Sequence, residues 1–252
     1  MHFHKGKSPN LFTFTKKTSL FLQARKKKYE GFSRNIPSLV RAMIQKDVCA
    51  RYSVRYPEAL WQIANLLLDN VAQEMPLRQI TRRMDIASPH TVKKYVDYLT
   101  NAYLICPIQK FSYKSIIRQS ANKIYAIDPA FVNMRGNTIK RDNTGWMLEN
   151  IIYIELRRRY HYETQSIYYM RQEGFEVDFV VMEGSTVAEL IQVSYDFSSP
   201  SAKQYRREVG GLLKGSRTTG CHNLTLIIGK GKTMEIKEGD ESINVCLASD
   251  WL

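Results

Sequence analysis

The stretch GFEVDFVVMEGSTVAELIQVSYD, residues 174–196, constrains the fold more than any other part of the chain. Two runs rich in β-branched and apolar residues flank the short polar segment EGST, which is typical of a turn. Two strands joined by so short a connection pair in antiparallel fashion. The stretch therefore predicts a β-hairpin, and the hairpin determines which side chains face each other.

Alternate residues of a strand lie on the same face of a sheet. On the first strand, this alternation predicts that Val177, Phe179 and Val181 share one face. Glu176 and Asp178 then lie on the opposite face. A shift of one residue in the register would reverse these faces.

On the second strand, Leu190, Gln192 and Ser194 share a face. Asp178 and Gln192 lie at almost equal distances from the turn at residues 184–185. Antiparallel pairing therefore brings Asp178 and Gln192 close together across the hairpin. An Asp that faces a polar pair on the next strand is the arrangement of a metal-dependent nuclease centre.

The segments around the hairpin predict an α/β domain over residues 144–252. Helices that flank a mixed sheet give this fold class. Helical patterns alternate with extended ones, the helices over residues 145–162 and 201–215 and the strands over residues 165–173, 223–236 and 242–252.

The first of these helices supplies the expected third member of the polar site. Glu149 stands between Leu148 and Ile152, where a purely surface carboxylate is unexpected. Glu155, further along the same helix, is the alternative. Glu176 is interpreted instead as half of a cross-strand or surface ion pair with Arg171.

Residues 36–130 predict a helical domain with a helix-turn-helix. Helical periodicity begins at Ile36, and a later short helix over residues 77–84 is followed by the turn DIAS. A second helix then begins with Ser88 as its N-cap and Pro89 as its first residue. Helix, short turn and helix form this motif. The segments YLICPIQKFSY and NKIYAID that follow would form the wing of a winged-helix domain.

The second helix of this motif carries the candidate contacts to DNA. Its apolar residues face inward, whereas His90, Lys93 and Lys94 point outward and would lie near the major groove. Asp97 shares that outer face and would oppose phosphate binding. Packing of this helix against another protein is the competing interpretation.

The net charge of +13 is concentrated in a basic leader over residues 1–35, which holds nine Lys and Arg and one acidic residue, for +8. Residues 36–252 therefore carry 13 − 8 = +5. Lys26, Lys27 and Lys28 are candidate contacts to nucleic-acid phosphates. Acidic lipid headgroups are an alternative partner, and a solvated, disordered leader is the interpretation without a partner.

Several classes of protein are not expected from the sequence. No apolar run approaches the roughly 20 residues that cross a bilayer, so no membrane span is predicted. The four cysteines lie far apart without C-x-x-C spacing, which predicts free thiols in a reducing cytoplasm. The segment GKGKTM has Leu226 where a phosphate-binding P-loop requires glycine. We interpret it as a hairpin turn and expect no ATP site.

Several short motifs in order resemble the C-terminal region of a family of prokaryotic AAA-type ATP-binding proteins. They are TVKKYVDYLTNAYLI, KIYAID, LEN and EVDF, followed by the strand that contains Gln192-Val193. The resemblance covers about residues 36–252 and implies a winged helix followed by a restriction-endonuclease-like domain of the PD-(D/E)xK type. In that family an ATPase domain precedes this region, and its motifs are missing from this sequence.

The resemblance also implies roles for individual residues. Glu149 would be the helical carboxylate, Asp178 the metal-binding aspartate, and residues 192–194 the (D/E)-x-K strand. Such a nuclease uses catalytic carboxylates to hold Mg²⁺ or Mn²⁺, and a cationic side chain lies beside the attacking water. Here Gln192 replaces the second carboxylate, and Ser194 replaces the lysine. The following helix offers substitutes for that cation, namely Lys203, Arg206 and Arg207.

Four interpretations of the function remain open from the sequence. The chain would be a DNA-associated module with a degenerate nuclease-like site, or a Mg²⁺/Mn²⁺-dependent DNA endonuclease that still cleaves. Alternatively, it would be a docking module for a separate ATPase subunit or for self-association, or a gene remnant without catalytic activity.

Overall fold

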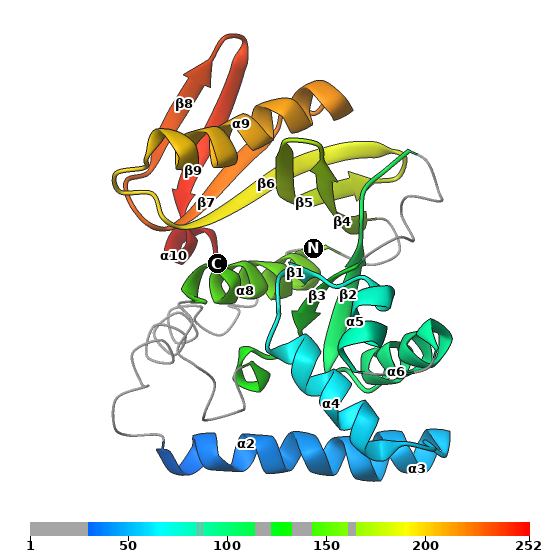
Figure 1. Cartoon of the computed structure of the whole chain (residues 1–252). Coiled ribbons are helices and arrows are strands. Elements are labelled where there is room, and N and C mark those ends of the chain that lie inside the picture. The colour runs from blue at the N-terminus through cyan, green and yellow to red at the C-terminus, as the bar shows by residue number, and fades with distance from the viewer. Residues whose placement is uncertain (1–29, 85, 87, 114–121, 133–142, 161–164) are drawn as a thin grey trace, which may run out of the picture.

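The computed structural model describes residues 30–84, 86, 88–113, 122–132, 143–160 and 165–252. In this part of the chain, a helical layer and a small sheet precede a larger mixed sheet with helices on both faces (Figure 1). The α/β fold class with N-terminal helices is confirmed. No helix of the described ranges is long and apolar enough to cross a membrane.

The first helical segment begins earlier than predicted. Helix α2 (Glu30–Met43) continues as the π-helical η2 (Ile44–Cys49) and as α3 (Ala50–Tyr52). The predicted boundary at residue 36 therefore lies inside α2, because tertiary packing around the buried Val40 and Ile44 supports the helix more than local composition does. Residues 1–29, including Lys26, Lys27 and Lys28, lie outside the described residues.

The next helices follow the predicted pattern. Helix α4 (Pro57–Leu68) has Pro57 at its start, and the two-residue strand β1 (Gln73–Glu74) leads into α5 (Leu77–Arg83). Helix α6 (Pro89–Asn101) begins at the predicted cap, where the Ser88 side chain accepts a hydrogen bond from the His90 backbone N–H. Both helices of the predicted helix-turn-helix are confirmed as helices.

The small sheet contains both strands that were predicted after α6. Strands β2 (Ile105–Gln109) and β3 (Asn122–Ala126) are antiparallel, and β3 also pairs with β1. The strand order is β1-β3-β2, so β3 is central. The short β1 has no clear sequence signal and was not predicted.

The large sheet has the order β4-β5-β6-β7-β9-β8 and is mixed, as predicted. Only the pairs β6/β7 and β7/β9 are parallel. Its strands are β4 (Gln165–Gln172), β5 (Phe175–Glu183), β6 (Thr186–Asp196), β7 (Leu224–Lys230), β8 (Met234–Glu238) and β9 (Glu241–Leu247).

Two long helices cover the faces of this sheet (Figure 1). Helix α9 (Ala202–Thr219) packs on one face through Val209 and Leu212. Helix α8 (Thr144–Arg159) packs on the other face and also contacts the small sheet, so it is buried almost all round. The short η3 (Pro129–Phe131) and α10 (Ala248–Trp251) complete the described elements.

The connection that resembles a P-loop is not a hairpin turn. Residues 231–233 join β7 to β8, but these two strands are separated by β9 in the sheet. The prediction of a hairpin turn is wrong because β9 returns between β7 and β8. Extended structure after the turn is confirmed, since β8 follows it.

The alternation predicted for β5 fails at one place. The pairing of β4 with β5 shifts between Tyr168↔Val180 and Met170↔Val177, which is a β-bulge. Val177 therefore packs in the core on the α9 side, whereas Phe179 and Val181 pack on the α8 side. The prediction that these three residues share a face is wrong, because the bulge adds one residue between them.

Candidate functional site

A buried lysine forms the centre of the candidate site. Lys123 lies on β3, a strand whose other residues are mostly apolar, and only 3% of its surface is exposed. Its Nζ lies 2.9 Å from Glu149 Oε1, 2.8 Å from Glu176 Oε1 and 3.0 Å from Asp178 Oδ1. An ammonium has three N–H donors, and here each has a carboxylate within reach. We call Lys123 and these three carboxylates the Lys123 cluster.

Three elements that are distant in the sequence supply this cluster. Lys123 comes from the small sheet, Glu149 from α8, and Glu176 and Asp178 from β5 of the large sheet. The β5 bulge lies at this point of the strand, where Asp178 meets Lys123. The lysine therefore joins the small sheet to the large one through its contacts with the carboxylates of β5.

The LEN segment of α8 explains how the two sheets are held in this position. The Tyr125 hydroxyl donates to Glu149 Oε1 over 2.6 Å. The neighbouring Asn150 side chain forms two hydrogen bonds with the Ala126 backbone, accepting from its N–H and donating to its carbonyl. Leu148 packs in the apolar core between the sheets. Each residue of the motif therefore fixes β3 or its surroundings.

Burial and charge determine the protonation of the cluster. Burial alone would lower the Lys123 pKa, but the surrounding Glu149, Tyr125, Asp178 and Glu176 raise this pKa well above its ordinary value. The ammonium is therefore charged. Burial, aided by the Asp178 charge, raises the pKa of Glu149 to about 8 against the opposing effect of Lys123.

The other two carboxylates differ from each other. Burial raises the pKa of Asp178, since it outweighs the opposing effect of Lys123. Burial also acts on Glu176, but the Lys123 charge outweighs it and lowers the Glu176 pKa. Near neutral pH the cluster therefore holds one ammonium, an ionised Glu176, and a Glu149 carboxyl that largely keeps its proton.

Gln192 lies next to Asp178, as predicted from the hairpin. Phe179 pairs with Ile191, and one step further the Asp178 backbone N–H donates to Gln192 Oε1 over 3.2 Å. In return, the Val193 backbone N–H donates to Asp178 Oδ2 over 3.0 Å. The predicted proximity of Asp178 and Gln192 is confirmed. In both of these hydrogen bonds between β5 and β6, the acceptor is a side-chain oxygen and not a backbone carbonyl.

The side chain of Gln192 points toward α9 and not toward Lys123. Its Nε2 donates to Glu208 Oε2 over 2.8 Å, and Glu208 is 1% exposed. Arg207 donates to the same carboxylate. Burial raises the Glu208 pKa, although Arg207 acts in the opposite direction. Ser194 shares this face, as predicted, and accepts a hydrogen bond from Gln204 Nε2.

The predicted substitutes for the missing lysine do not join the cluster. Lys203 and Arg206 are exposed on α9, and Arg207 binds Glu208. The cation comes instead from β3, which the prediction did not consider. A lysine within the apolar strand NKIYAID was the available signal, because a buried lysine requires a partner.

The remaining predicted members lie elsewhere or have a second role. Glu155 binds Arg158 and Arg159 at the end of α8. Glu176 is the register partner of Arg171, with 3.9 Å between their charged atoms, and it also belongs to the cluster. The predicted ion pair is therefore present, but it describes only half of the Glu176 environment.

The carboxylates in this arrangement do not fit a divalent cation. The Lys123 ammonium lies among the oxygens that would serve as ligands. Within the described ranges, no group of three or more Asp, Glu, His or Cys side chains is arranged to hold a metal ion. Lysine displacement would be needed before Mg²⁺ or Mn²⁺ could bind to these oxygens.

The predicted DNA contacts lie on an exposed basic surface. His90, Lys93 and Lys94 are exposed on α6, and Lys93 binds Asp97 over 2.9 Å. Helix α5 adds exposed cations that were not predicted as contacts, namely Arg78, Arg82 and Arg83. We call these exposed residues of the two helices the α5–α6 surface.

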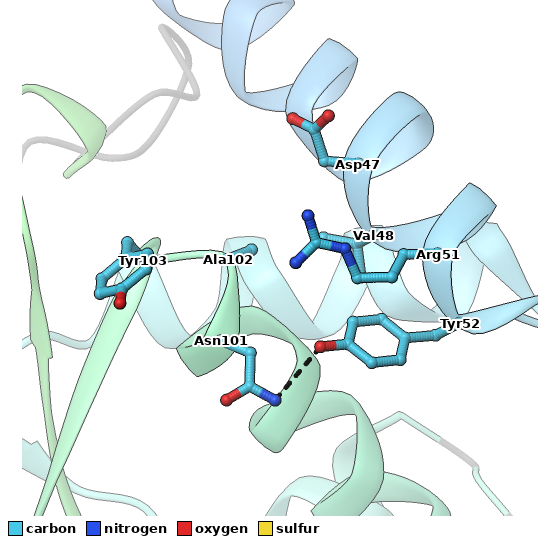
Figure 2. Close-up of a pocket in the computed structure, with 7 residues that line it drawn as sticks. All are labelled: Asp47, Val48, Arg51, Tyr52, Asn101, Ala102 and Tyr103. Carbon is cyan, nitrogen blue, oxygen red and sulfur yellow. Dashed lines mark hydrogen bonds between the residues drawn. The ribbon is translucent and has the colours of Figure 1, made fainter.

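A separate hollow lies between η2, α3 and the end of α6 (Figure 2). Arg51 points into it, and Asn101 Nδ2 donates to the Tyr52 hydroxyl at its base. None of the residues that line it belongs to the Lys123 cluster or to the α5–α6 surface. The hollow therefore contributes nothing to the predicted site.

Comparison with known proteins gives two family matches. Residues 22–141 match the domain of unknown function DUF8612, and residues 144–243 match the domain of unknown function DUF4143. An uncharacterized protein of Methanocaldococcus jannaschii is 30% identical over 187 residues, which is 73% of this chain and 40% of that protein. An uncharacterized protein of Haemophilus influenzae is 26% identical over 250 residues, or 92% of this chain and 58% of that protein.

No solved structure gives a significant match. The chain spans only 40% and 58% of the lengths of the two curated relatives. Two models of domains of unknown function thus match successive parts of the chain, DUF8612 first and DUF4143 after it.

Proposed function

We propose that this chain is a nucleic-acid-binding module with a nuclease-like centre that does not cleave, in which the Lys123 ammonium takes the place of a divalent cation. The position of Lys123 Nζ, within 3.0 Å of three carboxylates, carries this proposal. A metal ion and this ammonium would compete for the same oxygens.

The cost of removing the lysine supports a permanent role. An ion that leaves a buried cluster leaves uncompensated charges behind, and breaking such a pair costs roughly 3–5 kcal/mol. Ordinary Mg²⁺ binding through one or two carboxylates would have to exceed this cost.

The cation that nuclease chemistry requires beside the attacking water is also missing from its expected position. A cation beside the attacking water would have to come from position 194, where the neutral Ser194 hydroxyl instead accepts a hydrogen bond from Gln204. The Lys123 ammonium has its three donors directed at carboxylates and has none left for a water molecule. Both observations favour a centre that has a structural role.

The N-terminal domain supports the nucleic-acid part of the proposal. The element order α4-β1-α5-α6-β2-β3, with β3 central in its sheet, is compatible with a winged helix. On the α5–α6 surface the nearby Asp97 is already paired with Lys93. Among the described residues, no ion pair involves the remaining cations of this surface, so they can contact phosphates. Phosphate contacts supply most of the affinity of such domains.

The relation to an ATPase belongs to the same proposal. The resemblance implies an ATP-binding domain ahead of this region, and the two relatives have unmatched lengths in which a further domain fits. This chain would then be the part that contacts nucleic acid, and it would act together with an ATPase.

A cleavage and binding experiment tests the proposal. Wild type, Asp178→Ala and an Arg82→Gln/Arg83→Gln/Lys94→Gln variant are incubated with single-stranded, duplex and branched DNA in Mg²⁺ or Mn²⁺. We expect salt-sensitive binding by wild type, weaker binding by the triple variant, and no cleavage by any of them.

Two results would overturn the proposal. Metal-dependent cleavage by wild type that disappears in Asp178→Ala would identify an active nuclease, with Lys123 as its cation. Absence of DNA binding, together with concentration-dependent self-association, would favour a docking module.

A further inference from the structure

Helix α9 has a second basic surface on the opposite side of the large sheet from α8 (Figure 1). Its apolar side packs against the sheet through Val209 and Leu212. The packing is close at Gly215, where a Cβ atom would lie within 3.1 Å of the Val177 and Leu190 side chains. The outward side bears exposed cations, namely Lys203, Arg206, Arg207, Lys214 and Arg217. We call these five residues the basic face of α9.

The basic face is not balanced by acidic residues of its own helix. The acidic residue of α9, Glu208, is 1% exposed and binds Gln192 and Arg207 below the surface. The intervals of three, four and seven residues between the cations place them along one side of the helix. The helix therefore presents a row of positive charge.

Most of these cations are available to an external anion. Lys214 donates to the Gly174 carbonyl and forms no ion pair with any carboxylate that the structure describes. In the described part of the chain, neither Lys203 nor Arg206 forms an ion pair with a carboxylate. The other two cations interact with carboxylates: Arg207 forms an ion pair with Glu208, and Arg217 interacts electrostatically with Glu241.

The shape of this surface favours a phosphate backbone. From Lys203 to Arg217 the helix rises about 21 Å at 1.5 Å per residue, so the charges form a row and not a pocket. Gly210, in the middle of the row, has nothing within 4 Å of the position that a Cβ would occupy. A long polyanion can therefore approach the helix closely at this point.

A lipid surface fits less well. Helices that bind membranes insert large apolar side chains beside their cations. On α9 the large apolar residues Val209 and Leu212 are buried in the protein core, and Tyr205 and Leu213 are half-buried against it. The exposed positions of the face carry charged or small residues only.

We propose that the basic face of α9 binds the phosphate backbone of a nucleic acid without sequence selectivity. The inference rests on the proposed function for the nature of the ligand, and it adds a second contact surface on the other domain. A chain of contacts from Arg207 through Glu208 and Gln192 to Asp178 runs from this face to the acidic centre. The bound backbone would thus lie beside the nuclease-like centre.

The test compares two charge-neutralised forms of the full chain. Lys203→Gln/Arg206→Gln/Lys214→Gln removes available cations from the face, whereas Arg158→Gln/Lys232→Gln/Lys237→Gln removes as many exposed cations elsewhere. Fluorescence anisotropy with a labelled random-sequence duplex gives Kd as a function of salt, and circular dichroism verifies folding.

Each phosphate contact that is lost lowers the slope of log affinity against log salt by about 0.9. We expect the α9 variant to lose roughly 2 to 3 from this slope and to bind at least about tenfold more weakly at low salt. The control variant should keep the slope of wild type. An unchanged slope in the α9 variant overturns the inference, as does lost binding to anionic vesicles with unchanged binding to DNA.

The α5–α6 variant, Arg82→Gln/Arg83→Gln/Lys94→Gln, separates this inference from the proposed function. If it loses DNA binding while the α9 variant keeps the wild-type slope, the inference fails and the proposed function stands. If only the α9 variant weakens binding, the inference stands and the α5–α6 surface is not the contact.

Discussion

The ammonium of Lys123 on β3 lies 3.0 Å from the carboxylate of Asp178 on β5. These residues are 55 positions apart and belong to different sheets. The small sheet therefore supplies the cation that the acidic centre of the large sheet contains.

Removing this cation should destabilise the protein strongly. Lys123→Met removes the buried ammonium that Glu149, Glu176 and Asp178 share. Loss of one member of a buried ion pair costs roughly 3–5 kcal/mol. Unfolding in urea at neutral pH measures the loss. Lys93→Met, which breaks the exposed pair with Asp97, is the matched control and should cost less than about 1 kcal/mol. Equal losses in both variants would show that the cluster has no special energetic role.

Two adjacent glycines of α9 provide a test of how closely this helix packs. A Cβ at Gly211 would lie 2.6 Å from the Glu176 backbone oxygen, whereas one at Gly210 would have nothing within 4 Å. Gly211→Ala should therefore cost about 1–3 kcal/mol through a clash with β5. Gly210→Ala should be neutral or stabilising by up to about 1 kcal/mol, because alanine favours the helix. Thermal unfolding of both variants checks this, and a destabilised Gly210→Ala would contradict it.

An acidic residue at position 192, as the nuclease pattern requires, should destabilise this protein. Gln192 Nε2 donates to Glu208 Oε2 over 2.8 Å, so Gln192→Glu would place two carboxylates against each other. We expect Gln192→Glu to lower the unfolding free energy and Gln192→Glu/Glu208→Gln to recover most of it. A Gln192→Glu variant as stable as wild type would mean that Glu208 does not depend on this hydrogen bond.

The stability of the protein should depend on pH through Glu149. The folded-state pKa of about 8 lies above the ordinary 4.5, so the folded protein binds the proton more strongly than the unfolded chain does. The stability from this proton is fully present below pH 4.5 and is lost as the pH rises through 8.

Glu149→Gln should remove that dependence, since the amide keeps an acceptor for Tyr125 and cannot ionise. Between about pH 5 and 9, a range that includes the Glu149 pKa, the unfolding free energy of Glu149→Gln should decrease less than that of wild type. Glu155→Gln is the control, because the Glu155 pKa is lowered and its contribution disappears only in acid. Parallel pH profiles for wild type and Glu149→Gln would refute the role of Glu149.

Local patterns were sufficient to predict most of the elements. The turn residues fixed the hairpin and the pairing of Asp178 with Gln192, and Ser88-Pro89 fixed the start of α6. The bulge at β5 could not be predicted, because it depends on how β4 pairs and not on the β5 sequence. Lys123 was missed because a tertiary contact across 55 residues leaves only one local sign, a lysine in an apolar strand.

Manganese binding tests the central claim most directly. Electron paramagnetic resonance of Mn²⁺ titrated with wild type, Lys123→Met and Lys123→Met/Asp178→Asn reports free metal, and circular dichroism verifies that each protein is folded. If Lys123 takes the place of a divalent cation, wild type leaves millimolar Mn²⁺ free, Lys123→Met binds it, and the added Asp178→Asn reverses this. Binding by wild type that Asp178→Asn abolishes, or a folded Lys123→Met that binds no Mn²⁺, would contradict the account.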